Sequence, residues 1–427
     1  MAIPYEQREE HLRRLALASY EHLMRGEFEV GEKVAREFLA VAKDASGQWC
    51  SLAHLRLGTI LENALRYEEA LQHANAAMEA VSPGEPGRYH ALVLLGNIRM
   101  NQGGLAAAKS HFLDASDHLP DCSPVFCCLS ALESRMGNTK LSHEYAQKAL
   151  EAARRKDDRE HISVAHSLLG DAALDVGDSS QAEKHFRSAL AISEELDRRR
   201  GISIACERLS KFESDRRNYS AALELGQRAV QAEREMGRAA ATVNTCLRVL
   251  CEIREAENPE VLSSAVSMCQ TAFEAADESA DKVSALQNES WFHRKLKQFD
   301  RAKEVLIESL SYLEESDEET ARTYGLIGLL KKKQDRLGDA QVAFKHSLEL
   351  AHRYNHTAAQ LAAHNSLGFV TYEMGDPIQA RSHWQAALKI AGDSGNKAKV
   401  KQLEENLKLF RVTFLHRLWH WLNWSRV

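Results

Sequence analysis

The chain has 427 residues, enough for two or three ordinary domains or for one elongated array without a single core. Its 7 prolines and 22 glycines are scattered, Ala, Leu, Glu and Arg dominate, and runs of strand-forming residues are absent, so the composition predicts an all-α protein. A formal net charge of -6 with both signs interleaved argues against a surface that follows nucleic-acid phosphates, and we expect no nucleic-acid partner.

The N-terminal segment 1–14 has no apolar core of signal-peptide length, and no window reaches the roughly 18 uncharged apolar residues of a membrane-spanning helix. Eight cysteines occur without C-x-x-C spacing and within helical patterns, where cysteine behaves as a small buried hydrophobe. We therefore expect a cytoplasmic protein with reduced thiols.

A repeated pattern begins weakly at residues 15–40 and then recurs along the chain. One small residue marks each of nine clear units, and successive markers lie 34 to 43 residues apart. These markers are Ala77, Ala115, Ala149, Ala189, Ala229, Ala272, Ser309, Ser347 and Ala387. A fixed period of this length indicates a solenoid, in which pairs of helices stack on their neighbours.

Each unit carries small residues where its two helices are expected to cross, because a larger side chain there would push the helices apart. On the first helix these residues are Gly58, Gly96, Gly170, Gly328 and Gly368, with Ser130, Ser210 and Ser290 as substitutes. On the second helix they are Ala70, Ala108, Ala182, Ala222, Ala302, Ala340 and Ala380. We expect Phe112, Phe186, Phe344 and Trp384 to fill the space beneath the alanines.

Turn signals separate the helices of a unit, as in Gly375-Asp376-Pro377, where Gly ends one helix and Pro opens the next. The unit at 238–275 departs from the pattern, since it lacks the Leu-Gly landmark and carries an extra segment. In that segment Asn258 can cap a helix that Pro259 begins. We expect a bend or a widened groove in this unit.

This pattern resembles the tetratricopeptide repeat over about residues 10–392, in the long-helix variety with spacing near 40 residues. The resemblance implies a right-handed superhelical solenoid of about ten antiparallel helix pairs over residues 1–392. It also implies a concave groove, lined by the first helix of each unit, that binds a protein or peptide segment.

The resemblance assigns polar and aromatic residues to this groove, with amide and acidic side chains in the front units and basic ones in the later units. They are Asn97, Asn101, Asp171, Asp175, Asp215, Trp291, Arg294, Lys295, Arg322, Lys332, Lys333, Asn365 and Tyr372. Asparagine side chains can satisfy the backbone of a bound peptide, and the basic end can select carboxylates. The competing interpretation is that these charges are only the solvated faces of surface helices.

The end of the chain differs in kind from the repeats. Residues 396–409 are expected to form a polar-backed capping helix, and residues 410–427 a basic, Trp-rich amphipathic tail. The contact residues expected in the tail are Phe414, Leu418, Trp421, Leu422 and Trp424. Capping of the array, docking on a partner or a second copy of the chain, and contact with a membrane surface are three roles that the residues do not separate.

Catalytic motifs are absent from the sequence: there is no phosphate-binding Gly loop, H-E-x-x-H helix or nucleophile elbow. His352 and His356 stand four residues apart, but no third metal ligand accompanies them, and we expect no catalytic residue, metal site or cofactor. The leading hypothesis is a non-catalytic adaptor or regulatory scaffold. The alternatives are a peripheral membrane assembly factor anchored by the tail and a peptide-sensing subunit that controls a separate effector.

Overall fold

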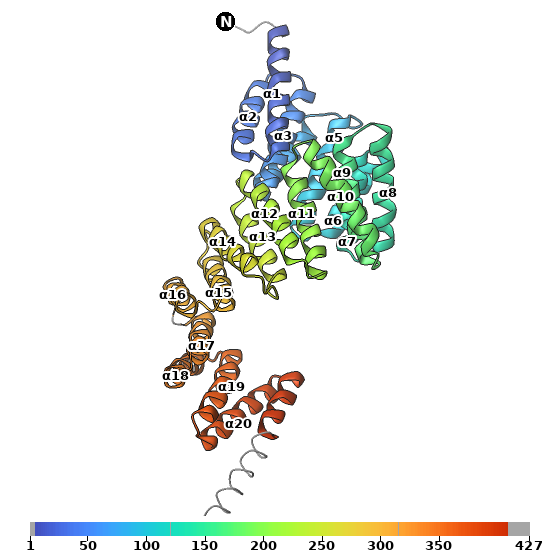
Figure 1. The fold of residues 1–427 in the computed structure, drawn as a ribbon. Coiled ribbons are helices and arrows are strands. Elements are labelled where there is room, and N and C mark those ends of the chain that lie inside the picture. The colour runs from blue at the N-terminus through green and yellow to red at the C-terminus, as the bar shows by residue number, and fades with distance from the viewer. Residues whose placement is uncertain (1–4, 120, 315, 409–427) are drawn as a thin grey trace, which may run out of the picture. The chain divides into compact units, whose positions relative to one another are not determined.

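A computed structural model describes residues 5–119, 121–314 and 316–408 of the chain. These residues form helices and turns, with no strand among them, so the all-α prediction is confirmed. Figure 1 shows consecutive helices of each unit lying side by side, as expected for stacked helical pairs.

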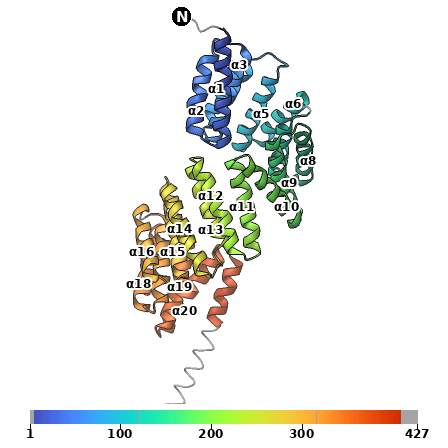
Figure 2. The same cartoon turned by 45° about the horizontal axis from the view of Figure 1, so that its top comes forward.

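The chain divides into two compact units, unit 1 (Met1–Ile253) and unit 2 (Arg254–Val427), and the division falls within the atypical repeat. Unit 1 contains α1 (Tyr5–Arg25), α2 (Phe28–Ala42), α3 (Gly47–Asn63), α4 (Tyr67–Glu79), α5 (Pro86–Asn101), α6 (Leu105–His118), α7 (Ser123–Arg135), α8 (Thr139–Arg155), α9 (Arg159–Asp175), α10 (Ser179–Glu195), α11 (Arg199–Asp215), α12 (Tyr219–Glu235) and α13 (Ala239–Glu252). Unit 2, coloured yellow to red in Figures 1 and 2, contains α14 (Pro259–Ala275), α15 (Ser279–Lys295), α16 (Phe299–Ser309), the 3-10 helix η1 (Leu310–Tyr312), α17 (Glu318–Lys333), α18 (Leu337–Arg353), α19 (Thr357–Glu373) and α20 (Pro377–Asp393).

In four helix pairs, a glycine of the first helix lies against an aromatic ring of the second helix. A Cβ atom built on Gly368 would lie 2.4 Å from Nε1 of Trp384, and one built on Gly170 would lie 2.6 Å from the ring of Phe186. Real Cβ atoms do not approach neighbours this closely, so only glycine allows the ring to lie on the backbone of the first helix. The expected crossings are therefore present.

In three of the helical repeats, serine takes the place of this glycine and adds a hydrogen bond. Ser210 Oγ donates to the carbonyl of Ala222 at 2.8 Å, and Ser290 Oγ donates to that of Ala302 at 2.9 Å. Ser130 makes the same contact, at 2.9 Å, with the carbonyl of Ser142. Because these hydroxyls are buried and partnered, the substitution keeps the crossing close without leaving an unsatisfied polar group.

The helix starts follow the turn signals of the sequence. α14 begins at Pro259, and Asn258 Oδ1 accepts a hydrogen bond from the backbone N–H of Glu260 at 2.8 Å, so the expected cap is confirmed. α20 begins in the same manner, with Asp376 accepting from the N–H of Gln379 at 3.0 Å. Each cap satisfies one of the N–H groups that a helix start leaves unpaired.

Unit 1 closes on itself, because its first helices contact helices from its second half. Tyr20 on α1 donates a hydrogen bond from its hydroxyl to Glu160 of α9 at 2.8 Å. Arg200 of α11 donates to Asn63 at the end of α3, and Arg199 contacts the carbonyl oxygen of Arg25 at 3.4 Å. These partners lie more than a hundred residues apart in sequence, so a periodic pattern gives no sign of them.

After α20, residues 397–408 form a last helix, and Leu403 is fully buried against the Trp384 side of the final pair. Within the described part of the chain, no helix is long and apolar enough to cross a membrane. The tail residues Phe414, Leu418, Trp421, Leu422 and Trp424 lie outside the described residues, and the three roles considered for the tail remain predictions.

Candidate functional site

The residues assigned to the groove all lie on the first helices of their pairs. Asn97 and Asn101 lie on α5, Asp171 and Asp175 on α9, Asp215 on α11, Trp291, Arg294 and Lys295 on α15, Arg322, Lys332 and Lys333 on α17, and Asn365 and Tyr372 on α19. Asn97 through Asp215 belong to unit 1 and the others to unit 2, so the two sets are described separately.

The asparagines of unit 1 are engaged inside the protein. Asn101 Nδ2 donates to Glu62 at 2.6 Å, and Asn97 Oδ1 accepts from the Cys128 thiol at 3.3 Å. Burial raises the pKa of the Glu62 carboxyl, and the Asn101 hydrogen bond opposes that shift. Both amides therefore have internal partners, which a ligand would have to displace.

The acidic residues assigned to unit 1 fall into two kinds. Asp171 is partly buried and pairs with Arg208 at 3.0 Å, and burial raises the pKa of its carboxyl against the effect of that arginine. Asp175 and Asp215 are exposed at the ends of their helices. The structure does not bring these three carboxylates into one cluster with a shared partner.

A cluster that the sequence did not indicate closes unit 1. The Arg56 guanidinium lies 4.6 Å from the centre of the Tyr20 ring, and Arg198 pairs with Glu160 at 2.9 Å. Burial, followed by the Glu160 carboxylate, raises the pKa of Tyr20 to about 12. The Nε atoms of both arginines are buried and have no hydrogen-bond partner among the described residues.

A cavity of about 500 Å³ lies beside this closure, between the α1–α2, α3–α4 and α12–α13 turns. Its lining is mostly apolar and includes Phe28, Leu65 and Met236, with Asn63 and Arg238 among the polar residues. Cavities of a few hundred Å³ suit small ligands.

In unit 2 the structure gathers Trp291, Arg294 and Lys295 on one face of α15, at positions three and four residues apart. The guanidinium of Arg294 lies 4.1 Å from the Trp291 ring centre, and that of Arg254, in the turn before α14, lies 5.1 Å from it. Lys295 donates to the carbonyl of Ala256 at 3.3 Å, beside Arg254. We call Arg254, Trp291, Arg294 and Lys295 the Trp291 cluster.

The Trp291 cluster holds three cations, and none of them has an ion pair with a carboxylate in the part of the chain that the structure describes. Burial, and then repulsion from Arg254, lower the pKa of the Arg294 guanidinium. The indole Nε1 of Trp291 is buried without a hydrogen-bond partner among the same residues. Uncompensated positive charge beside an aromatic ring is suited to a carboxylate or another anion.

The other basic residues assigned to unit 2 are differently placed. Arg322 pairs with Glu319 on its own helix, and Lys332 pairs with Glu373 of α19 at 2.7 Å. Lys333 is exposed at the end of α17. The excess positive charge of this face is therefore concentrated at the Trp291 cluster rather than spread along α17.

An apolar pocket of about 170 Å³ lies between α17 and α19. Gly325, Leu326, Leu329, Ala362 and Ala363 contribute to its lining, together with Arg322 and Gln287. Gln287 stands one helical turn before Trp291 on α15, so the pocket and the Trp291 cluster are neighbours along α15.

Asn365 and Tyr372 on α19 complete the residues assigned to this face. The Asn365 Oδ1 atom is buried and accepts no hydrogen bond from any residue that the structure describes. The Tyr372 ring packs on Trp384 with 5.9 Å between ring centres. The Asn365 acceptor is therefore unsatisfied among these residues, while the aromatic ring of Tyr372 packs in the final pair.

Sequence reasoning did not find Arg254, because it belongs to a turn and not to a repeated helical position. The only available signal was its place beside the extra segment of the atypical unit.

The buried thiols of the chain are not activated as nucleophiles. Burial raises the pKa of the Cys206 thiol to about 11 and that of Cys246 to about 12, so both stay protonated at neutral pH. Over the described ranges, no group of three or more His, Cys, Asp or Glu side chains is arranged to hold a metal ion. The clusters described above consist of cationic, aromatic and apolar side chains, which are suited to contacts with a ligand.

Comparison with known proteins agrees with the fold. A family model described as tetratricopeptide repeat matches residues 123–195, the segment from α7 to α10. No curated protein matches the sequence.

Among solved structures, a signal transduction ATPase with numerous domains, the protein PH0952 of Pyrococcus horikoshii with its tetratricopeptide repeat sensor, is 15% identical with a TM-score of 0.53. The match covers 85% of this chain and 56% of that protein, so the chain spans little more than half of its length.

The apo form of the quorum sensor NprR from B. thuringiensis is 13% identical with a TM-score of 0.46, covering 80% of this chain and 99% of that one. The apo form of RapI is 12% identical with a TM-score of 0.40, and the match covers 90% of this chain and 99% of that one. Sequence identities this low indicate a similar fold and do not indicate a shared function. The matched segment and the glycine-aromatic crossings make the chain a tetratricopeptide-like helical repeat protein.

Proposed function

We propose that the chain is a non-catalytic regulatory scaffold, and that the first helices of unit 2 bind an acidic segment of a partner protein. The observation that carries this proposal is the Trp291 cluster, in which the guanidiniums of Arg254 and Arg294 contact the indole ring and Lys295 binds a carbonyl beside Arg254. None of the three cations has an acidic partner among the residues that the structure describes. A carboxylate of the bound segment would supply the missing negative charge.

The neighbouring pocket supports a second feature of the ligand. Its 170 Å³ and its lining of Leu, Ala and Gly residues suit one branched apolar side chain. The buried carbonyl oxygen of Asn365 has no donor in the described part of the chain, and a backbone N–H of the bound segment would satisfy it. The ligand is thus an extended segment in which an acidic residue stands close to an apolar one.

Reversing two charges tests this proposal. In the double variant Arg294→Glu, Lys295→Glu, binding of acidic peptides is expected to fall at least tenfold, because repulsion replaces attraction at the anion site. Arg294 also stacks on Trp291, and loss of that contact costs about 1 kcal/mol, so the fold should be retained. The measurement is a selection from a random peptide library on the full chain, followed by affinity titration of the selected peptides.

The matched control is Lys303→Glu, Lys345→Glu, which reverses two charges on the second helices α16 and α18. This control should bind the selected peptides as the parent chain does, and affinity for both should weaken as salt rises. Selected peptides without acidic residues, or equal binding by the two double variants, would refute the proposal.

A further inference from the structure

Three repeats contain a pair of histidines that face each other across the two helices of the repeat. The Nδ1 atoms of His54 and His73 are 2.9 Å apart, and those of His166 and His185 are also 2.9 Å apart. In the last pair, His364 and His383, the distance is 3.1 Å. The ring centres are 5.1 to 5.4 Å apart in all three pairs.

The two members of every pair stand 19 residues apart, at one register of the repeat. Other repeats have different residues at this register, namely Phe126 with Tyr145, Cys206 with Leu225, and Leu286 with Val305. Each first-helix histidine of this register has a second-helix histidine as its partner. The two imidazoles therefore occur together, and they replace the contact that other residues make at this register.

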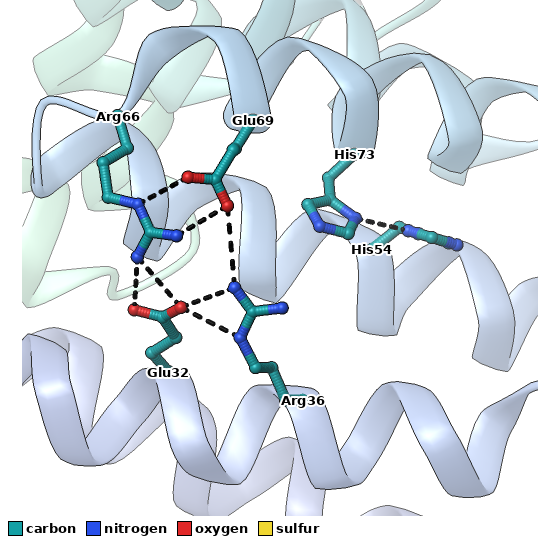
Figure 3. Close-up of polar contacts among 6 residues, drawn as sticks. All are labelled: Glu32, Arg36, His54, Arg66, Glu69 and His73. Atoms are coloured by element: carbon teal, nitrogen blue, oxygen red, sulfur yellow. Dashed lines mark hydrogen bonds and ion pairs between the residues drawn. The ribbon is translucent and has the colours of Figure 1, made fainter.

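Figure 3 shows the pair His54–His73 between α3 and α4, beside a chain of ion pairs that links α2 to α4. In that chain Arg66 contacts Glu32 at 2.8 Å and Glu69 at 2.6 Å. The carboxylates are thus held by arginines, and the rings of the two histidines are directed toward each other.

The first-helix imidazole of each pair is held in the neutral form, which is the form that binds metals. Burial, and then the partner ring, lower the pKa of His54, His166 and His364 to about 4. Burial also lowers the pKa of the second-helix partners His73, His185 and His383.

The second helix of the preceding repeat places positive or titratable side chains beside each histidine pair. Arg36 and Lys43 belong to the surroundings of the first pair, His143 and Arg154 to those of the second, and Lys345 and His352 to those of the third. Glu69 is the acidic group that acts on the first pair, and it is engaged by Arg66. Neighbouring cations oppose protonation of the pairs.

The distance between the nitrogens also fits two metal ligands. With metal–nitrogen bonds of about 2.0–2.1 Å, nitrogens this far apart subtend an angle of about 90–100° at the ion. That angle is nearer to adjacent positions of an octahedral or square-planar ion than to the roughly 109° of a tetrahedral one.

We propose that each of the three histidine pairs binds one divalent transition-metal ion of the nickel and copper type through its two facing Nδ1 atoms. Water fills the remaining coordination positions, because only two protein ligands meet at each pair. In the absence of the ion, one imidazole donates its Nδ1–H to the other, which is the contact that the structure contains. This inference is independent of the proposed peptide site.

The test is equilibrium dialysis of the full chain, without an affinity tag, against Ni²⁺ at pH 6.0, with the bound metal counted by elemental analysis. An ordinary histidine with a pKa of about 6.5 is roughly three quarters protonated at this pH, whereas His54, His166 and His364, with a pKa of about 4, are neutral. We expect saturable binding, and the variants His73→Leu, His185→Leu and His383→Leu should each remove one bound ion. The triple variant should remove three.

Leucine is a suitable replacement, since Leu225 occupies the same register in another repeat. The control is His111→Leu, which removes a partly buried histidine of the same register whose first-helix counterpart is Leu92, and it should leave the metal count unchanged. Where a leucine variant loses helical signal, broadening of the six imidazole resonances of the unmodified chain by paramagnetic Ni²⁺ reports on the pairs directly. An equal count in the parent and triple variants, or resonances that stay sharp, would overturn the proposal.

Discussion

Replacing Gly368 with leucine is expected to lower the free energy of unfolding of the last repeats by about 2–4 kcal/mol, through overpacking at the helix crossing. The Cβ alone would meet the Trp384 indole at 2.4 to 2.7 Å, before any of the larger side chain is placed. Because Trp384 is 3% exposed and packs with Phe369 and Tyr372, the ring has no free space into which it can move.

The loss should extend beyond the substituted repeat. Repeats are stabilised by their neighbours, and Leu403 of the final helix packs against the same cluster as Trp384. We expect the fluorescence of Trp384 to report an unfolding transition at lower denaturant concentration. The helical signal of the repeats remote from this crossing should change less.

The control is Gly338→Leu in the first turn of α18. A Cβ at Gly338 has nothing within 4 Å and the residue is exposed, so the same substitution adds the same atoms without a clash. Leucine also has a higher helix propensity than glycine, and the control should be neutral or slightly stabilising. Equal stability of the two variants would show that the crossing tolerates a side chain.

The small-residue pattern made these crossings predictable from sequence. Gly96, Gly170, Gly328 and Gly368 each lie against an aromatic ring of the second helix. Each contact joins two residues of the same repeat. The sequence of one repeat is therefore enough to predict it. The same holds for the Asn258 cap, which involves neighbours in the chain.

Contacts between distant repeats could not be predicted in this way. Tyr20 and Glu160 are 140 residues apart, and the closure of unit 1 that they stabilise depends on how small rotations accumulate from pair to pair. Arg254 was missed for a related reason, since its contact with Trp291 brings a turn residue to a helix face.

The sequence placed basic residues on the first helices, but it did not indicate which of them have acidic partners. Arg294, Arg322 and Lys332 all carry a positive charge on first helices. Arg322 and Lys332 have acidic partners, whereas Arg294 has none within residues 5–119, 121–314 and 316–408. Side-chain pairing of this kind depends on rotamers and on neighbouring helices, which one sequence does not specify. The tail was predictable only as an amphipathic segment, and its role remains a prediction.

Lowering the pH from 6.5 to 4.5 is expected to destabilise the protein through the histidine pairs. The pKa of His54, His166 and His364 is about 4 in the folded chain and about 6.5 in an unfolded one. The unfolded chain therefore binds protons in this interval that the folded chain does not, and stability falls as the pH falls.

Each of these three shifts corresponds to at most about 3 kcal/mol, since one pKa unit is worth about 1.4 kcal/mol. The six rings are only partly buried, and solvent screening reduces the effect to about 1–2 kcal/mol per pair, or about 3–6 kcal/mol for the three pairs. Such a loss is a large fraction of the net stability of an ordinary domain.

Urea denaturation at constant ionic strength, repeated in steps between pH 7.5 and pH 4.5, measures this dependence while most ordinary carboxylates remain ionised. The midpoint should be constant above pH 7 and fall steadily below pH 6.5. In the triple variant His73→Leu, His185→Leu, His383→Leu the slope should be smaller, because three titrating imidazoles are removed and the remaining three keep the shift caused by burial but lose the repulsion from a facing ring. A midpoint that stays constant down to pH 4.5 in the parent chain, or an identical slope in the triple variant, would show that the facing imidazoles accept a proton as easily as exposed ones do.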